Sequence, residues 1–281
     1  MGSFSNVLLA SDFDRTLTDF DSNIPQRNIE AILEFEAEGG LFTMATGRSL
    51  PMFRKYMPLV PTNAPLILYN GAALYDTVSE KLLWAEEIPG GVELVRTLHD
   101  RYPKLFLEVQ GVEHHYLFDE NPMREKFLDF FGASHKNIAI EQLPLPLIKP
   151  SFSGTFYDHT AAQFYTGTAE ELEYIRQVAE ELRRDFGDVM EVDIAMPRII
   201  DMQAKNVSKG RTARKLADAL DRKILVCCGD GLNDVSMLRE ADFPFVPCDC
   251  STELLNMGFN VTVSCNSGMI YGVIEELKKI L

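Results

Sequence analysis

The sequence predicts an α/β fold: a core domain built on a parallel sheet, with a smaller α+β domain inserted into it. Short apolar runs alternate with segments of helical spacing, and each run ends in a polar or glycine-containing turn. These runs are VLLASDFD (7–14), LFTMATGRS (41–49), PLILYNGA (65–72) and ILVCCGDG (224–231). Strand and helix in alternation indicate βαβ units and a Rossmann-like parallel sheet that is covered on both faces. Ligands bind such sheets beyond the carboxyl ends of the strands, where these polar turns lie.

Two helices of the core follow from their spacing and their end signals. Apolar residues recur at helical spacing behind Pro25, at Ile29, Ile32 and Leu33. Gly39–Gly40 should end that helix, because glycine readily takes the left-handed conformation at a helix terminus. The segment 209–220 has the same spacing, and Ser208 is a candidate N-cap for it.

The middle of the chain has a different pattern. Helical segments alternate there with neighbouring strand-like segments, such as KLFLEVQG and EHHYLFD, that are joined by short turns. This predicts an antiparallel or mixed sheet with helices on one face. We expect AAQFYTG (161–167) to be a further strand, the proline-rich stretch 141–154 to be an ordered loop, and the acidic helix 169–184 to present a solvated face.

A chain of 281 residues is long enough for two domains with separate cores. We therefore expect the core domain to comprise residues 1–85 and 198–281 and the inserted domain to comprise residues 86–197.

Composition narrows the classes of partner. The formal charge of −15 argues against nucleic acid or an anionic membrane as a partner, since both require a positive surface. The chain has no apolar run of about 18 residues. We expect no signal peptide, because the apolar run VLLA near the N-terminus has four residues and no basic residue precedes it. Among the five cysteines, Cys227 and Cys228 lie in an apolar run, which is typical of free thiols in a reducing compartment. We expect a cytoplasmic protein that is a monomer or a weak homo-oligomer.

Four polar clusters fall at the ends of predicted strands: DFDRT (12–16), ATGRS (45–49), VSKG (207–210) and GDGLND (229–234). In this order they resemble the four motifs of the haloacid dehalogenase (HAD) superfamily of phosphotransferases. NGA (70–72) and the α/β insert resemble its Cof-type sugar-phosphatase branch. The resemblance implies a phosphatase of small phosphorylated metabolites, in which the insert is a cap that sets specificity.

The chemistry of phosphate-ester hydrolysis suits these residue types. A carboxylate can attack phosphorus and form an acyl phosphate, a role for Asp12. Asp14, two residues further on, can protonate the leaving group and then activate water. Together with Asp230 and Asp234 they bring four negative charges to one site, an arrangement that a divalent cation would stabilise. Mg²⁺, which prefers oxygen ligands, is the expected cofactor.

The resemblance also implies individual roles. Asp12, the backbone carbonyl of Asp14 and Asp230 would bind the metal, and Asp234 would reach it directly or through water. Thr46 would bind a phosphoryl oxygen, and Lys209 would neutralise its charge. The other expected substrate-side residues are Arg15, Gly47, Arg48, Asn70, Gly71 and Asn233, with Gly229 and Gly231 allowing tight turns.

The first motif departs from its commonest form, which has glycine where this chain has Arg15. Its side chain is either solvated or an additional contact to substrate. Two other pairs have structural interpretations: His114–His115 would project to opposite faces of a strand, and Cys248-x-Cys250 lacks a second ligand pair.

Two alternative functions remain open. A phosphomutase has a similar layout but retains the phosphoryl group, and a non-catalytic module could use the same Mg²⁺ and phosphate pocket. Candidate substrates are sugar phosphates and also flavin or pyridoxal phosphates, which members of the branch accept.

Overall fold

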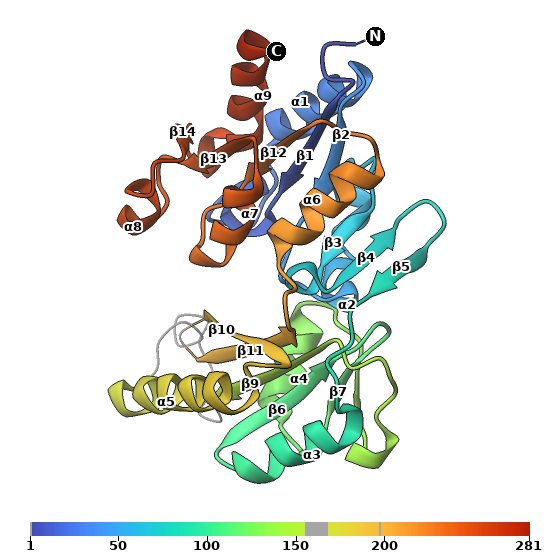
Figure 1. Ribbon diagram of the computed structural model, residues 1–281, viewed down its shortest axis with the longest axis vertical. Coiled ribbons are helices and arrows are strands. Elements are labelled where there is room, and N and C mark those ends of the chain that lie inside the picture. The colour runs from blue at the N-terminus through green and yellow to red at the C-terminus, as the bar shows by residue number, and fades with distance from the viewer. Residues whose placement is uncertain (1, 155–167, 197) are drawn as a thin grey trace. The chain divides into compact units, whose positions relative to one another are not determined.

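The computed structural model describes residues 2–154, 168–196 and 198–281. The chain forms two compact units (Figure 1). The first unit comprises Met1–Gly47, Tyr56–Trp84 and Ser208–Leu281. The second comprises Arg48–Lys55 and Ala85–Val207.

The first unit is built on a sheet of the strand order β14-β13-β12-β1-β2, in which every neighbouring pair is parallel. The strands are β1 (Val7–Ser11), β2 (Leu41–Met44), β12 (Ile224–Cys228), β13 (Phe243–Pro247) and β14 (Asn260–Thr262). β1 is buried along its whole length. The parallel α/β core predicted from the sequence is confirmed.

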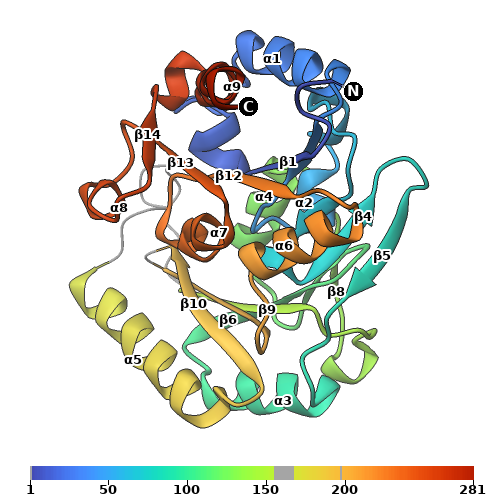
Figure 2. The same ribbon diagram turned by 45° about the horizontal axis from the view of Figure 1, so that its top comes forward.

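Helices cover both faces of this sheet. α1 (Gln26–Ala37) packs beside α9 (Met269–Ile280), and α6 (Lys209–Ala219) packs beside α7 (Val235–Glu240) (Figure 2). Leu8 and Ala10 of β1 share a buried apolar cluster with side chains of α6 and α7, among them Ala213, Leu216, Met237 and Leu238. Because side chains alternate along a strand, Val7 and Leu9 point to the opposite face.

Both predicted core helices form, with small differences. α1 buries Asn28, Ala31, Ile32 and Phe35, whereas Leu33 is about half exposed, so the apolar face is rotated from the one expected. Ser208 is the N-cap of α6, and its Oγ accepts a hydrogen bond from the N–H of Arg211 at 3.2 Å. This cap fixes where α6 begins, and Lys209 is therefore its first residue.

A small antiparallel element lies beside the parallel sheet. β3 (Leu66–Leu68), β4 (Ala73–Asp76) and β5 (Lys81–Ala85) form a three-stranded sheet in that order. One parallel bridge, between Ala45 and Ile67, connects β3 to the chain that follows β2. The first unit also contains the short helix α8 (Thr252–Leu255).

The second unit has a six-stranded sheet of the order β10-β11-β9-β6-β7-β8. Its strands are β6 (Leu105–Gln110), β7 (His115–Leu117), β8 (His135–Asn137), β9 (Lys149–Gly154), β10 (Met190–Met196) and β11 (Ile199–Ala204). Only β7 and β8 pair in parallel among these described strands, so the sheet is mixed as predicted.

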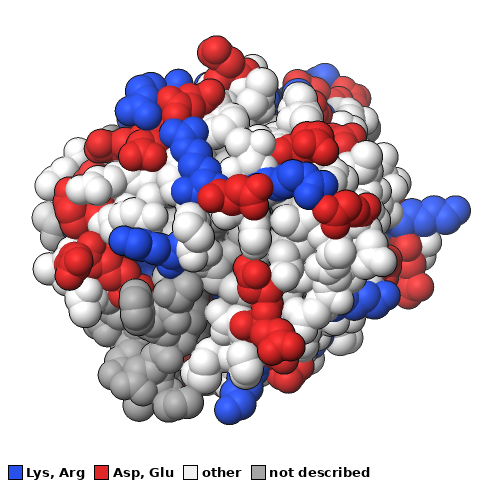
Figure 3. Space-filling model, turned by 90° about the horizontal axis from the view of Figure 1, so that it is seen from below, with Lys and Arg blue, Asp and Glu red and all other residues white. Residues whose placement is uncertain are grey.

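Three longer helices accompany this sheet: α3 (Gly91–Arg101), α4 (Pro122–Phe130) and α5 (Ala169–Phe186). The acidic helix α5 carries exposed ion pairs such as Arg176–Glu173 at 2.8 Å. Figure 3 shows acidic and basic side chains interspersed over one face of the molecule. Glu171 is an exception to the predicted solvated face, because it is buried and accepts a hydrogen bond from Arg198 at 2.7 Å.

The extent of the second unit differs from the inserted domain that the sequence predicted. Residues 198–207 belong to it, because β11 pairs with both β9 and β10. The short helix α2 (Leu50–Phe53) belongs to it as well. Ser49, the N-cap of α2, lies 2.6 Å from Nε2 of the buried His115, and Met52 packs against Phe106 and its neighbours.

The proline-rich stretch 141–154 was expected to be a loop, but its second half is the strand β9. The prolines at 144 and 146 precede β9, but Pro150 lies within it and pairs with Val109 of β6. β9 is a central strand between β11 and β6, and all of its residues are buried. The strand predicted for residues 161–167 lies outside the described residues. Within the described ranges, no helix combines the length and apolar character that a membrane crossing requires.

We predict that a truncation has to follow the unit boundary to leave a folded first unit. Replacing residues 85–207 by a short linker should give one cooperative thermal transition, although α2 would lose its partners. Replacing only residues 86–197 leaves β11 without both pairing strands, and its buried Ile200 and Met202 would be exposed. Circular dichroism melting and light scattering of both proteins test this. Equal behaviour of the two truncations would contradict the boundary at Val207.

Candidate active site

Three neighbouring parallel strands of the first unit bring the polar motifs to one edge of the sheet. Ser11, the last residue of β1, lies in register with Met44 of β2 and Cys228 of β12. The backbone continues this alignment, since the N–H of Asp12 donates to the carbonyl of Cys228 at 2.9 Å. Asp12, Thr46 and Asp230 therefore follow strand ends that meet at the same edge.

The chain turns sharply after Asp12. Phe13, Thr16 and Leu17 are buried in this turn, while Asp14 is half-buried and Arg15 is exposed. Arg15 has a φ of 56°, in the left-handed region that favours glycine. The N–H of Arg15 donates to Oγ1 of Thr18 at 3.1 Å, which stabilises the turn.

A buried ammonium group joins two of the candidate carboxylates. Nζ of Lys209 lies 2.5 Å from Oδ1 of Asp12 and 2.7 Å from Oδ1 of Asp234. All three side chains are nine-tenths or more buried. Burial alone would lower the pKa of Lys209, but the carboxylates of Asp12 and Asp234 raise it above its ordinary value, so the ammonium stays charged.

One lysine does not offset the negative charge of this cluster. Burial raises the pKa of Asp12 well above its ordinary value, and the Asp234 charge adds to this effect, against the opposing influence of Lys209. Burial and the Asp234 charge likewise raise the pKa of Asp230 to about 7. Ionising both Asp12 and Asp230 at neutral pH thus calls for more positive charge than Lys209 supplies.

The same carboxylates are close enough to share a cation. One oxygen atom from each of Asp12, Asp230 and Asp234 lies within 4.8 Å of the others. An all-oxygen donor set of this kind fits Mg²⁺, which is typically bound by carboxylates and retained waters. The expected ligands Asp12, Asp230 and Asp234 are therefore brought together, and the excess negative charge of the cluster fits a divalent ion.

Asp234 is fixed by its own loop. Its Oδ2 accepts hydrogen bonds from the N–H groups of Gly231, at 3.0 Å, and Asp230, at 3.2 Å. A Cβ at Gly229 would lie 2.7 Å from Cγ of Asp234, so the close approach of this loop requires glycine there. Asn233 of the same loop is exposed.

The predicted phosphate-side residues form a second, neighbouring group. Thr46 is buried, and its carbonyl accepts a hydrogen bond from the N–H of Asn70 at 3.1 Å. A Cβ at Gly47 would lie 2.6 Å from Oδ1 of Asn70. Gly71 has a φ of +99°, and a Cβ there would lie 2.8 Å from the backbone nitrogen of Lys209. The NGA turn thus packs directly against the start of α6, which carries the lysine.

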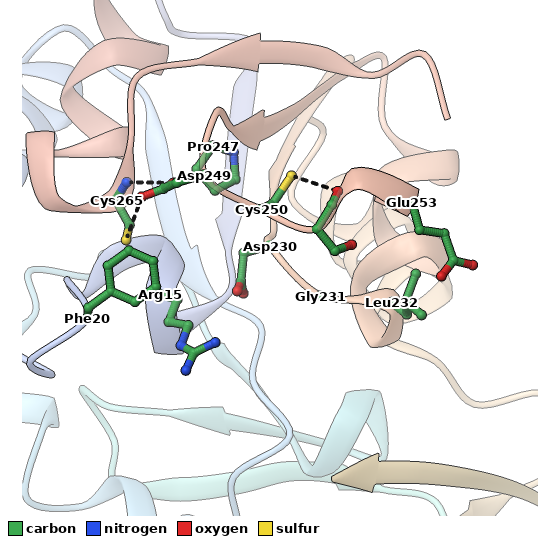
Figure 4. A pocket seen from close by; sticks show the side chains of 11 residues that line it. Arg15, Phe20, Asp230, Gly231, Leu232, Pro247, Asp249, Cys250, Glu253 and Cys265 are labelled. Carbon is green, nitrogen blue, oxygen red and sulfur yellow. Dashed lines mark hydrogen bonds between the residues drawn. The ribbon is translucent and has the colours of Figure 1, made fainter. Parts of the chain in front are cut away.

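Two other expected site residues have different surroundings. Arg48 belongs to the second unit, where its Cζ lies 5.1 Å from the centre of the Phe131 ring. Its role toward substrate stays a prediction. Arg15 lines a pocket of about 300 Å³ that also includes Asp230 (Figure 4).

The sequence did not indicate the rest of this pocket. Phe20, Pro247, Asp249, Cys250 and Cys265 line it, and they come from three separate stretches of the chain. Cys250 was interpreted as structural, and no spacing rule connects it to Arg15. Thr16 was part of the first motif, but its contact was not predicted: its Oγ1 lies 3.4 Å from Oδ1 of Asp230.

Comparison with known proteins identifies the family. The family model for haloacid dehalogenase-like hydrolases matches residues 9–274. The chain is 26% identical over 241 residues to the 5-amino-6-(5-phospho-D-ribitylamino)uracil phosphatase YcsE of Bacillus subtilis, a match that covers 83% of this chain and 80% of the relative. It is 22% identical over 246 residues to the pyridoxal phosphate phosphatase YbhA of Escherichia coli, which covers 83% and 84% of the two chains.

A solved structure has the same fold. The haloacid dehalogenase-like hydrolase from Bacteroides thetaiotaomicron superimposes with a TM-score of 0.78 at 17% identity, over 98% of this chain and 99% of the other. The chain belongs to the haloacid dehalogenase-like hydrolase family, and it is an enzyme of the phosphatase class. The family resemblance found in the sequence is confirmed.

We predict that the metal-free protein becomes less stable as the pH rises from about 5 to about 7.5. Because folding raises the pKa of Asp230 from 3.8 to about 7, the folded state binds more protons than the unfolded state in this range. The free energy of unfolding then falls with increasing pH. Melting temperatures in EDTA measure this fall, and added Mg²⁺ should raise the melting temperature more at the higher pH.

The matched control is Asp230→Asn, which removes the titrating carboxylate but keeps its shape. Its melting temperature should fall less steeply over the same pH range, and Mg²⁺ should stabilise it less. Parallel pH profiles for the native and Asp230→Asn proteins would contradict the assigned cause.

Proposed function

We propose that this enzyme is a Mg²⁺-dependent phosphatase of small phosphorylated metabolites that works through an aspartyl-phosphate on Asp12. The observation that carries the proposal is the buried cluster in which Lys209 contacts Asp12 and Asp234, with Asp230 beside them. Burial of this much charge is costly, and such clusters are typical of sites that stabilise a highly charged reactant.

Asp12 is the proposed nucleophile. Its backbone N–H is bound to Cys228, and its Oδ1 accepts a hydrogen bond from Lys209 at 2.5 Å, so the position of the carboxylate is fixed. The other carboxylate oxygen can then attack phosphorus. A bond forms between that oxygen and phosphorus, and the bond from phosphorus to the leaving oxygen breaks.

Asp14 is the proposed general acid and base. It follows Asp12 by two residues and is half-buried, so its carboxyl group is accessible to a substrate and to water. In the first it gives its proton to the leaving oxygen. In the second it takes a proton from the water that attacks the acyl phosphate, which releases inorganic phosphate and restores Asp12.

The remaining residues would bind the phosphoryl group. Thr46, Gly47 and Asn70 lie together beside the start of α6, where hydroxyl, amide and backbone groups can donate to phosphoryl oxygens. The Lys209 ammonium would offset charge on the same oxygens. When bound by Asp12, Asp230 and Asp234, with the Asp14 carbonyl, Mg²⁺ would neutralise the attacking carboxylate and the phosphoryl group.

The proposed substrate class is broad. The two relatives act, by their names, on a phosphorylated ribitylamino-uracil and on pyridoxal phosphate. Sugar phosphates and phosphates of this kind are therefore the first compounds to examine. We propose that the second unit is the specificity cap, and that the protein acts on small molecules in the cytoplasm.

Phosphate release should require Mg²⁺. Removal of metal with EDTA should abolish turnover of an aryl phosphate, and Mg²⁺ should restore it. Ca²⁺ should restore far less, because it takes more ligands at longer distances and would misplace Asp12. A colorimetric phosphate assay gives the result. Full turnover after chelation would rule out the proposed metal dependence. With a sugar phosphate in place of the aryl phosphate, an isomerised product without free phosphate would indicate a phosphomutase.

Asp14→Asn tests the assignment of the two aspartates. Loss of the general acid should slow the hydrolysis of a sugar phosphate by about 10²–10⁴-fold, because its alkoxide is a poor leaving group. An aryl phosphate needs little protonation, so it should still release phenol in an initial burst while phosphoenzyme accumulates. Rapid quench and intact-protein mass spectrometry measure both.

Asp12→Asn is the matched control, and it should show neither burst nor turnover. Equal losses on both substrates in Asp14→Asn, without trapped phosphoenzyme, would mean that the roles of the two aspartates are wrongly assigned.

A further inference from the structure

The pocket beside Asp230 contains a guanidinium group that the proposed chemistry does not use. Arg15 and Phe20 stand on one side of this pocket of about 300 Å³, Leu232 and Glu253 on the other, and Asp230 between them (Figure 4). The pocket therefore adjoins the candidate metal site. Every one of these residues belongs to the first unit.

The Arg15 side chain has a defined neighbour and free hydrogen-bond donors. Its Cζ lies 5.4 Å from the centre of the Phe20 ring. Among the described residues, its guanidinium forms no hydrogen bond or ion pair with another side chain. A guanidinium over an aromatic face keeps its N–H edge available, and that edge matches a carboxylate or a phosphate.

The aromatic side of the pocket is held in place. Phe20 is 49% exposed, and its N–H donates to Oδ1 of Asn266 at 3.1 Å. The same loop is closed by Asp19, whose Oδ1 accepts from the N–H groups of Asp21 and Asn23 at 2.9 and 2.8 Å. The backbone that carries the ring is thus held in place at the pocket.

The backbone gives a separate reason to examine Arg15. Its φ of 56° is disfavoured for a residue with a Cβ, and glycine would avoid this cost. Backbone conformations of this kind concentrate at functional sites. The side chain that glycine would lack is directed into the pocket, next to Asp230.

The acidic residues of the pocket limit where an anion can lie. Asp249 already accepts from the N–H of Cys265 at 3.3 Å and from its Sγ at 3.5 Å. Glu253 is exposed on the side opposite Arg15 (Figure 4). A negative group would therefore be stable only at the Arg15 end, and the part of the pocket near Glu253 suits neutral hydroxyl groups.

We infer that Arg15 is a specificity-determining residue that binds a second anionic group, a carboxylate or a second phosphate, on the leaving part of the substrate. This rests on the proposed phosphatase function and narrows its substrate class. The preferred substrates would be phosphorylated acids or bisphosphates instead of phosphates of neutral polyols. Phe20 would hold the guanidinium plane so that its edge faces that group.

Matched substrates test the inference. In the first pair, 6-phosphogluconate has a carboxylate where sorbitol 6-phosphate has a hydroxymethyl group. In the second pair, fructose 1,6-bisphosphate has a second phosphate that fructose 6-phosphate lacks. In each pair the readout is the ratio of kcat/KM for the more anionic compound to that for the other. The native enzyme should favour the anionic member of at least one pair, and which pair it is identifies the group.

Three variants locate the effect. Arg15→Gln should lower the preferred ratio about tenfold, since a hydrogen bond to a charged partner is lost. Arg15→Lys keeps the positive charge but lacks the planar N–H edge of the guanidinium, so it should give an intermediate ratio. Arg239→Gln removes the same charge from an exposed position outside the pocket and should leave the ratio unchanged. Calorimetric titration of the same compounds into Asp12→Asn, with and without Arg15→Gln, should show the same preference in Kd.

The outcomes separate this inference from the proposed function. Turnover of an aryl phosphate with no anionic preference in either pair overturns only the inference. Equal losses on both members of a pair in Arg15→Gln overturn it too, and would mean that Arg15 acts through Asp230. Absence of phosphate release from every compound, with no binding to Asp12→Asn, overturns both.

Discussion

The charge of one buried lysine organises the catalytic edge of the first unit. Lys209 contacts Asp12 and Asp234, which are brought to it from the end of β1 and from the loop after β12. Its own place is set by the Ser208 cap of α6 and by the NGA turn that packs against that helix start. The position of this single ammonium group therefore depends on the register of the strands, on the helix cap and on the glycine turn.

That ammonium group is not sufficient by itself. The raised pKa values of Asp12 and Asp230 indicate that the protein alone leaves the carboxylates under-neutralised. A site built in this way is prepared for a cation and for a reaction in which charge moves between oxygens. The need to hold Asp234 at this site explains the close packing of the loop after β12. Gly229 lets Asp234 approach, and the N–H groups of Asp230 and Gly231 donate hydrogen bonds to Oδ2 of Asp234.

Arg15 illustrates how one residue can add specificity without altering this core. It follows Asp14 directly, but the hydrogen bonds that hold the buried cluster join Lys209 to Asp12 and Asp234 and do not involve its side chain. Its side chain instead reaches the pocket formed by the Phe20 loop and the segment around Asp249. Variation at such a position can change which leaving group is preferred, while the chemistry at phosphorus is retained.

The sequence by itself determined the parallel core and the main members of its site. Three apolar runs are followed by Asp12, Thr46 and Asp230. This pattern was sufficient to predict that the three side chains lie close together, because parallel strands place their carboxyl ends at one edge of the sheet. Lys209 was expected because VSKG resembles the third motif of the haloacid dehalogenase superfamily. These features depend on local pattern and on chain order.

Only the tertiary structure decided the features that depend on pairing between distant segments. β11 belongs with β9 and β10, and α2 with His115, because each finds its hydrogen-bond partners there, and no local pattern specifies those partners. For the same reason the Arg15 pocket was not visible in the sequence. Its walls come from segments more than two hundred residues apart, and their approach is set by packing around the sheet.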